Sequence, residues 1–170
     1  MPKVFIKKFL TSPLSIGAIA PSSKYLASKM CKIIDKLENY PVLEVGAGTG
    51  AITKAIIQKN PKLIEIDSEL SNLLKIKYPF LTVINNCCIE EMYKEASPFG
   101  LVVSIPLINN PIKPRFIKTL ADLYTRGFIK WCVIYTYGNS NPLKDVRFKA
   151  THKHPIVFRN IPPARVWSYE

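Results

Sequence analysis

The sequence has few cysteines, and their arrangement excludes a disulfide-stabilised scaffold. Its 170 residues contain four, none of them in a C-x-x-C pair: Cys31, Cys87, Cys88 and Cys132. Cys87 and Cys88 are neighbours in the chain, and so small a ring strains disulfide geometry. We therefore expect reduced thiols, as in a cytosolic protein.

Histidine is scarcer still, with only His152 and His154, which flank Lys153. No cysteine or carboxylate stands at metal-ligand spacing from this pair, so a solvated strand face explains it better than a metal site. We expect no metal.

Long apolar runs are missing, which excludes a conventional membrane-spanning helix. No stretch approaches the roughly 18 uninterrupted apolar residues that such a helix needs. The N-terminus imitates a signal peptide with Lys3, Lys7 and Lys8 before an apolar run, but residues 11–13 (Thr-Ser-Pro) interrupt that run. We expect no cleavage, and a chain of this length has room for one domain.

Acidic residues are outnumbered, and the imbalance lies at the two ends of the chain. Twelve acids stand against 24 Lys and Arg, for a net charge of +12. Residues 1–40 carry seven basic and two acidic residues (+5), residues 41–110 six and seven (−1), and residues 111–170 eleven and three (+8). Basic flanks are attracted to phosphate on nucleic acid or on an anionic bilayer, although a solubilising surface is the alternative.

The first ten residues favour the bilayer. On a helix, four apolar side chains would share one face and three lysines would lie toward the other: Phe5, Ile6, Phe9 and Leu10 against Lys3, Lys7 and Lys8. Such a helix can lie in a membrane interface, but it can equally dock on the protein's own core.

Three of only seven glycines fall in one short segment, VLEVGAGTG (42–50). The pattern predicts a buried strand entering a turn at Gly46, Gly48 and Gly50, followed by a helix from Ala51 whose start faces a bound group. Nineteen residues after Gly46, Glu65 lies in a second apolar strand, where an acid binds a ribose diol in nucleotide-binding units. Together these features predict an adenosine-containing cofactor rather than a plain strand-to-helix connection.

The remaining pattern alternates between helices and strands. A helix capped by Ser22 or Ser23 carries apolar residues at helical spacing. Further helices are expected at 51–59, 68–77 and 114–126, and strands at 62–66, 81–85, 101–104, 128–137, 156–159 and 165–169.

The acid that opens the glycine turn, Glu44, makes the segment resemble motif I of the class I S-adenosylmethionine-dependent methyltransferases. The wider sequence resembles the bacterial phospholipid N-methyltransferases in six segments: IGAIAPSS (16–23), LEVGAGTGAIT (43–53), IEID (64–67), VVSIPL (102–107), YTYG (135–138) and NIPPARVWSY (160–169). Similarity to their sister group, the ribosomal RNA adenine dimethyltransferases, is confined to the central motifs.

This resemblance implies an α/β fold: a single-domain Rossmann-like sheet, mostly parallel, with an antiparallel C-terminal hairpin. Residues 1–40 would form an amphipathic helix, a lid loop and a helix, and residues 41–170 the S-adenosylmethionine-binding domain. Glu44 would face the methionine amino group. The implied cofactor residues are Glu44, Gly46, Ala47, Gly48, Gly50, Glu65, Ile66, Cys87, Cys88 and Ser104.

Two positions depart from the family pattern. Asn86-Cys87-Cys88 replaces a G-D-A-like turn whose Asp holds the adenine amino group, although a backbone amide there could still bind the ring. Gly100 stands where an Asp usually precedes the fourth strand, which we regard as a mild change.

The chemistry of the methyl acceptor distinguishes a lipid substrate from an RNA substrate. An adenine methyltransferase normally stacks a flipped base on an aromatic ring after the proline of an Asn-x-Pro-aromatic turn, whereas this chain has Leu107 after Pro106. An alkyl amine instead needs deprotonation, alignment and exclusion of water, for which Ser104 Oγ could accept the ammonium's hydrogens.

We therefore expect catalytic roles for Ser104, Pro106 and Tyr25. Aromatic faces bind methylated ammonium groups, and the candidates, which are also plausible core residues, are Tyr25, Tyr135, Tyr137 and Trp167. Lys24 or Arg165 would hold a lipid phosphate.

The sequence-based hypothesis is a cytoplasmic enzyme, peripherally associated with the inner membrane, that uses S-adenosylmethionine to methylate phosphatidylethanolamine toward phosphatidylcholine. Its expected partner is an anionic membrane surface with its phospholipid substrate; nucleic acid is disfavoured, and no obligate protein partner is inferred. The alternatives are an RNA adenine N6-methyltransferase and a catalytically degenerate basic binding protein.

Overall fold

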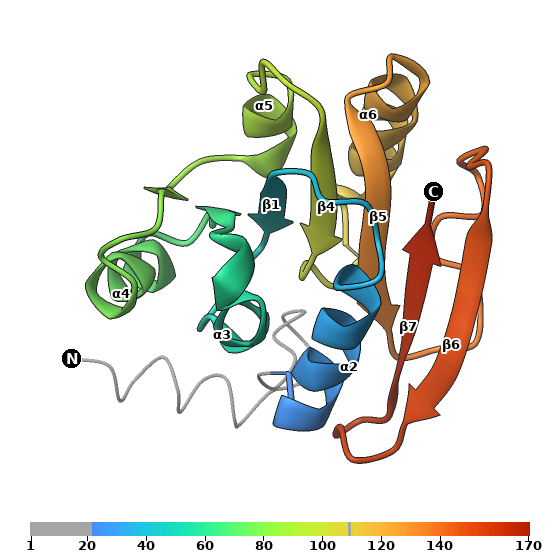
Figure 1. The fold of residues 1–170 in the computed structure, drawn as a ribbon, viewed down its shortest axis with the longest axis horizontal. Helices are drawn as coiled ribbons and strands as arrows, with labels where there is room; N and C mark the ends of the chain where they lie inside the picture. Colours follow the sequence, from blue (N-terminus) through green and yellow to red (C-terminus); the bar gives the residue numbers. More distant parts are fainter. Residues whose placement is uncertain (1–21, 109) are drawn as a thin grey trace.

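A computed structural model describes residues 22–108 and 110–170 (Figure 1). The N-terminal amphipathic helix and most of the lid loop expected from the sequence lie outside these residues, so they stay predictions, as does the division of the chain at residue 40. In the described part, seven strands form one sheet in the order β3-β2-β1-β4-β5-β7-β6.

The first five strands in this order pair in parallel. Strand β7 is antiparallel to both of its neighbours, β5 and β6. The strands are β1 (Val42–Val45), β2 (Lys62–Ile64), β3 (Val83–Ile84), β4 (Phe99–Val103), β5 (Ile129–Thr136), β6 (Thr151–Val157) and β7 (Ala164–Tyr169). The expected Rossmann-like sheet with an antiparallel C-terminal hairpin is confirmed.

Helices cover both faces of the sheet (Figure 1). They are α2 (Lys24–Ile34), α3 (Ala51–Ala55), α4 (Ser68–Lys77), α5 (Cys88–Met92) and α6 (Lys113–Thr125), with a 3₁₀ turn η1 (Ile57–Lys59). Neighbouring residues of β7 point to opposite layers: Val166 joins the core under α2 and α3, and Trp167 joins the core under α5 and α6. The sheet is therefore the middle of three layers.

Helix α2 forms as its sequence pattern predicts. The Ser23 hydroxyl accepts a hydrogen bond from the Leu26 amide over 3.2 Å, which caps the first turn. Its apolar stripe is buried against β5 and β7: Leu26, Ala27, Met30, Ile33 and Ile34. Among the described residues, no helix is both long and apolar enough to cross a bilayer.

Four elements differ from the expectation in kind or by more than two residues at one end or in total length. The helix expected at 51–59 breaks at Ile56, whose φ of −105° and ψ of 16° lead into the 3₁₀ turn. Helix α5 was not expected, because five residues are too few to show a period, and β3 keeps only two of its five expected residues. Strand β6 starts at Thr151 rather than Ile156: it is an exposed edge strand with Pro155 in a register shift, so it lacks apolar alternation.

Gly100 lies inside β4 rather than before it, and the side chain of Trp131 explains why this position is a glycine. A Cβ atom added to Gly100 would lie 2.0 Å from Cζ2 of Trp131 on β5. The indole is fixed in place because its Nε1 donates to the Glu38 carbonyl over 2.9 Å. An Asp at position 100 would therefore collide with the Trp131 ring.

Candidate functional site

The turn after β1 contains three glycines with left-handed backbone. The φ angles of Gly46, Gly48 and Gly50 are +71°, +57° and +77°, a conformation that costs other L-residues energy. The Gly46 amide donates to the Ile64 carbonyl over 2.8 Å, which ties the turn to the end of β2.

Only one of these glycines presents bare backbone to open space. A Cβ at Gly46 would lie 2.5 Å from Cγ1 of Ile105, and one at Gly50 would lie 2.8 Å from the Tyr78 ring. At Gly48 the nearest atom would be the Gly46 carbonyl oxygen, 3.9 Å away. Gly46 and Gly50 thus serve the protein's own packing, although all three glycines were expected to face the ligand.

Glu65 lies against this open glycine. Its side chain is buried, with Oε2 accepting a hydrogen bond from the Gly48 amide over 2.7 Å and Oε1 accepting one from the Asp67 amide over 3.0 Å. The structure therefore brings together the turn and the acid that were expected to share a ribose. The next residue, Ile66, is 70% exposed.

Glu44 is completely buried behind the turn, and both of its carboxylate oxygens have partners. Thr53 Oγ1 donates to Oε2 over 2.7 Å, and Ser104 Oγ donates to Oε1 over 3.0 Å. Burial raises the pKa of Glu44 to about 7, with a smaller contribution from the negative charge of Glu65, while the two hydroxyl bonds oppose the rise. Ser104, expected to accept a proton from the substrate, here donates its own; its oxygen lone pairs can still accept.

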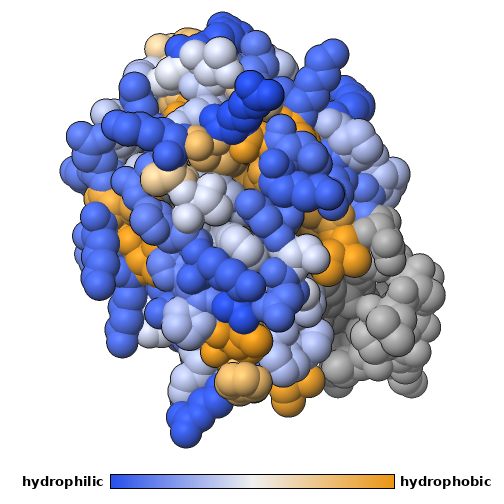
Figure 2. Space-filling model, turned by 90° about the vertical axis from the view of Figure 1, so that its right-hand side faces the viewer, coloured by the Kyte–Doolittle hydropathy of each residue, from blue (hydrophilic) through white to orange (hydrophobic). Residues whose placement is uncertain are grey.

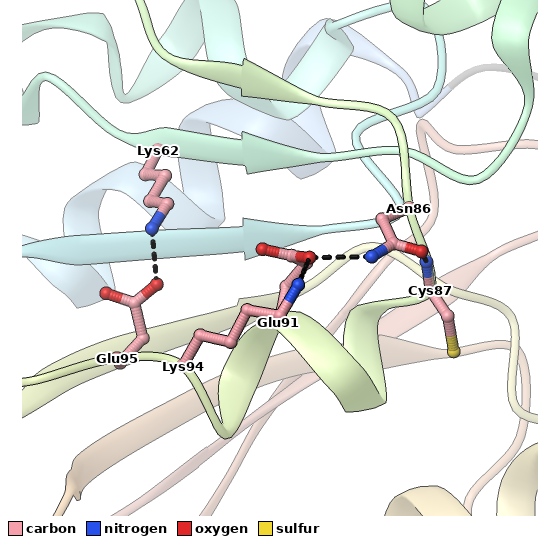
Figure 3. A network of polar contacts seen from close by, with 6 residues as sticks. All are labelled: Lys62, Asn86, Cys87, Glu91, Lys94 and Glu95. Carbon is pink, nitrogen blue, oxygen red and sulfur yellow. Dashed lines mark hydrogen bonds and ion pairs between the residues drawn. The ribbon is translucent and has the colours of Figure 1, made fainter.

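The expected adenine-binding segment is engaged in a polar network at the start of α5 (Figure 3). The Cys87 amide donates to Asn86 Oδ1 over 2.8 Å, and Asn86 Nδ2 donates to Glu91 Oε1 over 2.7 Å. The Lys94 ammonium, 2.6 Å from Glu91, and the Asn86 amide lower the pKa of that carboxyl. The backbone amide that was expected to meet adenine therefore already has a partner.

The two cysteines of this segment differ in environment. Cys87 is half-buried, whereas Cys88 is buried in the core under α5 and α6. Burial raises the pKa of the Cys88 thiol to about 12, so the thiol stays protonated. Cys88 is thus a packing residue at the base of the segment.

A cavity of 450 Å³ lies beyond the carboxyl ends of β4 and β5, where ligands bind in open α/β sheets. Pro106 lines it, together with Lys113, Tyr135 and Tyr137. The two tyrosine rings lie 5.7 Å apart, edge to face. Leu107 also lines the cavity but is only 5% exposed and packs in the core, so it offers no stacking surface.

Tyr25 lies at the start of α2, beside the turn between β6 and β7. This residue is 40% exposed, and Lys24 Nζ and Arg159 Cζ lie 5.3 Å and 4.9 Å from the centroid of its ring. The Ser23 amide donates to Asn160 Oδ1 over 2.8 Å, which fixes α2 to this turn. Arg159 was not among the residues expected at the site: it was predicted to end a strand at 156–159, whereas β6 ends at Val157 and Arg159 lies in the turn that follows. The available signal was its positive charge.

Two other expected ligand residues belong to the C-terminal hairpin and do not line the cavity. Arg165 Nη1 donates to the His154 carbonyl, and Trp167 is buried beneath Lys153. Within residues 22–108 and 110–170, no three His, Cys, Asp or Glu side chains come together as metal ligands.

Comparison with known proteins identifies the family. No family model matches the chain. The ribosomal RNA small subunit methyltransferase A of Wolbachia sp. subsp. Brugia malayi (strain TRS) is 37% identical over 134 residues, which are 74% of this chain and 47% of that protein. The crystal structure of the 23S rRNA methyltransferase ErmE superposes with a TM-score of 0.61 at 16% identity, covering 85% of this chain and 66% of that one.

The chain belongs to the class I S-adenosylmethionine-dependent methyltransferases. A more distant structure of this fold, the magnesium protoporphyrin IX methyltransferase of Synechocystis PCC 6803, contains bound S-adenosylmethionine and superposes with a TM-score of 0.55 at 10% identity, over 84% of this chain and 74% of that one. The chain spans less than half the length of the curated relatives that it matches.

Two expectations about the substrate are wrong. Phosphatidylethanolamine at an anionic membrane was the expected substrate, but the curated relatives of this chain are named for ribosomal RNA. Nucleic acid was the disfavoured partner, and the same relatives overturn that judgement.

Proposed function

We propose that this protein uses S-adenosylmethionine to methylate RNA, with the amino group of an adenine as the acceptor. The observation that carries the proposal is the contact between Glu65 and Gly48, because it places a carboxylate beside the only bare backbone of the turn. The cofactor would meet the protein there, and the acceptor would enter the neighbouring cavity.

The residues of the turn fit the nucleoside part of the cofactor. A carboxylate such as Glu65 accepts hydrogen bonds from both hydroxyls of a ribose diol, and Gly48 leaves room for a sugar to approach the backbone. Glu44 is completely buried behind them, and each of its oxygens already accepts a hydrogen bond from Thr53 or Ser104. We therefore assign it to positioning these two hydroxyls rather than to binding the methionine amino group. Cys87 and the Asn86 side chain border the place expected for adenine.

The bound cofactor supplies a methyl group on a sulfonium sulfur, which a nitrogen lone pair can attack. The residues of the chain then have to hold the acceptor, align it and exclude water. Ser104 and Pro106 follow β4 at the edge between the turn and the cavity. Tyr135 and Tyr137 line the same cavity and offer the aromatic character that Leu107 lacks.

RNA as the substrate is supported by charge as well as by the names of the relatives. The net charge of +12 favours association with a polyanion, and Lys113 and Lys144 line the acceptor cavity itself. A cavity of 450 Å³ falls in the size range of sites for small organic groups, which includes a single flipped base.

The test is methyl transfer from radiolabelled S-adenosylmethionine to a transcript of small-subunit ribosomal RNA, with phosphatidylethanolamine vesicles in a parallel reaction. We expect label in RNA, recovered after nuclease digestion as N6-methylated adenosine, and none in lipid. A Glu65→Ala variant should lose the label. Label in the vesicles, or none in RNA from protein that binds the cofactor, would contradict the proposal.

A further inference from the structure

One face of α2 and the turn that follows it carry a row of lysines that begins beside Tyr25. Tyr25, Lys29, Lys32 and Lys36 follow one another at intervals of four, three and four residues. Because each residue turns a helix by about 100°, the side chains of Tyr25, Lys29 and Lys32 leave α2 within roughly 60° of arc. Lys36 follows in the turn after the helix, which ends at Ile34. None of the positions in this row is acidic.

The edge strand β6 extends this row. His154 points to the same face of the sheet as α2, since its Nε2 lies 2.9 Å from Ser168 Oγ and α2 packs against β6 and β7. Burial lowers the pKa of His154, and the nearby Lys29, His152 and Lys36 lower it further, which places these groups around one another. We call the surface formed by Lys29, Lys32 and Lys36 the cationic flank; His152 and His154 of β6 border it.

The flank leads to the acceptor side of the sheet. Arg165 at the start of β7 pairs with Thr136 at the end of β5, so the β6–β7 turn lies at the edge where the cavity opens. Tyr25 and Arg159 stand at this end, and Lys36 at the other. At 1.5 Å per helical residue, the distance from Tyr25 to Lys32 along α2 is roughly 11 Å, and Lys36 lies in the turn beyond.

The few acids near this surface are committed elsewhere or lie at its far end. Asp35 faces away, with its carboxylate 3.3 Å from Lys59 beside α3. Glu170 lies 3.6 Å from His152, at the start of β6. A purely solubilising helix face usually mixes both signs of charge, and this one does not.

Among the described residues, the large exposed apolar side chains near the flank lie in the turn at its end. Phe158 and Ile161 are 75% and 84% exposed, but the cationic row itself contains only one ring, that of Tyr25. Figure 2 shows the molecule from the side of β6, where hydrophilic side chains cover most of the surface and apolar patches are separate. A long cationic row that ends at an aromatic ring suits a phosphodiester backbone followed by a base better than it suits a bilayer.

We propose that the RNA backbone lies along the cationic flank, so that a nucleotide at its end passes Tyr25 and Arg159 into the acceptor cavity. This inference rests on the proposed function for the identity of the substrate. It adds a binding surface on α2 and β6, outside both the cofactor turn and the cavity. Lysines that neutralise phosphates release counterions, so RNA affinity must depend on salt through these residues.

The test is RNA binding by a triple variant, Lys29→Ala, Lys32→Ala and Lys36→Ala, measured without cofactor by fluorescence anisotropy over a range of salt concentrations. A single-stranded RNA and a hairpin serve as probes. We expect affinity at physiological salt to fall roughly tenfold or more, and the slope of log K against log salt to decrease by about 2 to 3. The matched control removes the same charge elsewhere, with Lys75→Ala, Lys118→Ala and Lys149→Ala, and should change affinity less than about twofold.

Circular dichroism and melting temperature establish that both triple variants are folded. Equal losses in the two variants, or none in the flank variant, would overturn the inference; so would binding of the wild type to anionic vesicles but not to RNA. RNA bound through the flank without methyl transfer would contradict the proposed function alone. If the flank variant methylates RNA as well as the wild type does, this inference alone would be contradicted.

Discussion

The carboxylate of Glu65 accepts a hydrogen bond from the Gly48 amide over 2.7 Å, which ties the end of β2 to the turn that follows β1. Seventeen residues separate the two in the chain, and parallel pairing of β1 with β2 brings them together. The acid therefore lies beside the one glycine of the turn that has open space in front of it. This relationship is the basis for placing the cofactor.

Removal of the Glu65 carboxylate should weaken cofactor binding. A charged hydrogen-bonding group contributes about 1.5–3 kcal/mol, so a Glu65→Ala variant should bind S-adenosylmethionine roughly 10- to 100-fold more weakly in calorimetry. Glu69→Ala, which removes an exposed acid from the first turn of α4, is the control and should leave affinity unchanged. Equal affinity in wild type and Glu65→Ala would show that the cofactor does not use this acid.

The three glycines of the turn should respond differently to alanine. Gly46→Ala meets Ile105 and Gly50→Ala meets Tyr78, so both should lower the melting temperature by more than the backbone strain alone. Gly48→Ala has only the left-handed backbone to resist it, which costs about 1–2 kcal/mol, or a few degrees of melting temperature. The Gly48 variant should nevertheless lose cofactor affinity, because the methyl group occupies the open space.

Thermal unfolding and calorimetry of the three variants check this order. A Gly48→Ala protein that binds the cofactor as tightly as wild type would contradict the placement of the ligand at this glycine. A Gly46→Ala protein as stable as Gly48→Ala would contradict the packing against Ile105.

Glu44 should make stability depend on pH. Its pKa is raised from 4.5 to about 7 in the folded protein, so between these values the folded state binds more protons than the unfolded state. The corresponding stabilisation is fully present below pH 4.5 and is lost as pH rises through 7, a change of roughly 3 kcal/mol. In Glu44→Gln the same contribution should be absent.

Urea unfolding of wild type and Glu44→Gln at several pH values measures this effect as a difference, which cancels the contribution of other groups. We expect the wild type to lose stability relative to the variant from pH 4.5 to pH 7. A constant difference over that interval would mean that Glu44 is ionised throughout.

Gly100 should tolerate no side chain. Gly100→Ala places Cβ in the Trp131 ring, which cannot move without losing its bond to the Glu38 carbonyl, so we expect about 3 kcal/mol of destabilisation or more. Gly138→Ala is the control, because no atom lies within 4 Å of its added Cβ. Similar urea midpoints for the two variants would refute the close packing of β4 on β5.

The fold could be predicted from the sequence because its signals are local. The capping of α2 by Ser23, its apolar stripe and the glycine turn all depend on residues a few positions apart. Strand β6 could not be predicted, because an edge strand such as THKHPIV buries little and shows no alternation. The packing roles of Gly46 and Gly100 depend on Ile105 and Trp131, which are distant in the chain.

The cofactor-binding residues could be predicted from the sequence, whereas the substrate could not. Glu44, Gly48 and Glu65 belong to short motifs with fixed spacing, and the fold brings them together. The substrate was predicted wrongly because the phospholipid resemblance depended most on two short segments, 16–23 and 160–169. The first of these segments lies almost entirely outside the described residues. The cationic row on α2 was overlooked because the apolar face of that helix dominates its sequence pattern.

The most direct measurement is a crystal structure of the protein with S-adenosylmethionine. We predict the ribose hydroxyls within hydrogen-bonding distance of the Glu65 carboxylate, the sugar against Gly48, and the methyl group directed toward Ser104 and the cavity at Pro106. A cofactor bound away from the turn, or no binding at millimolar concentration, would contradict this account.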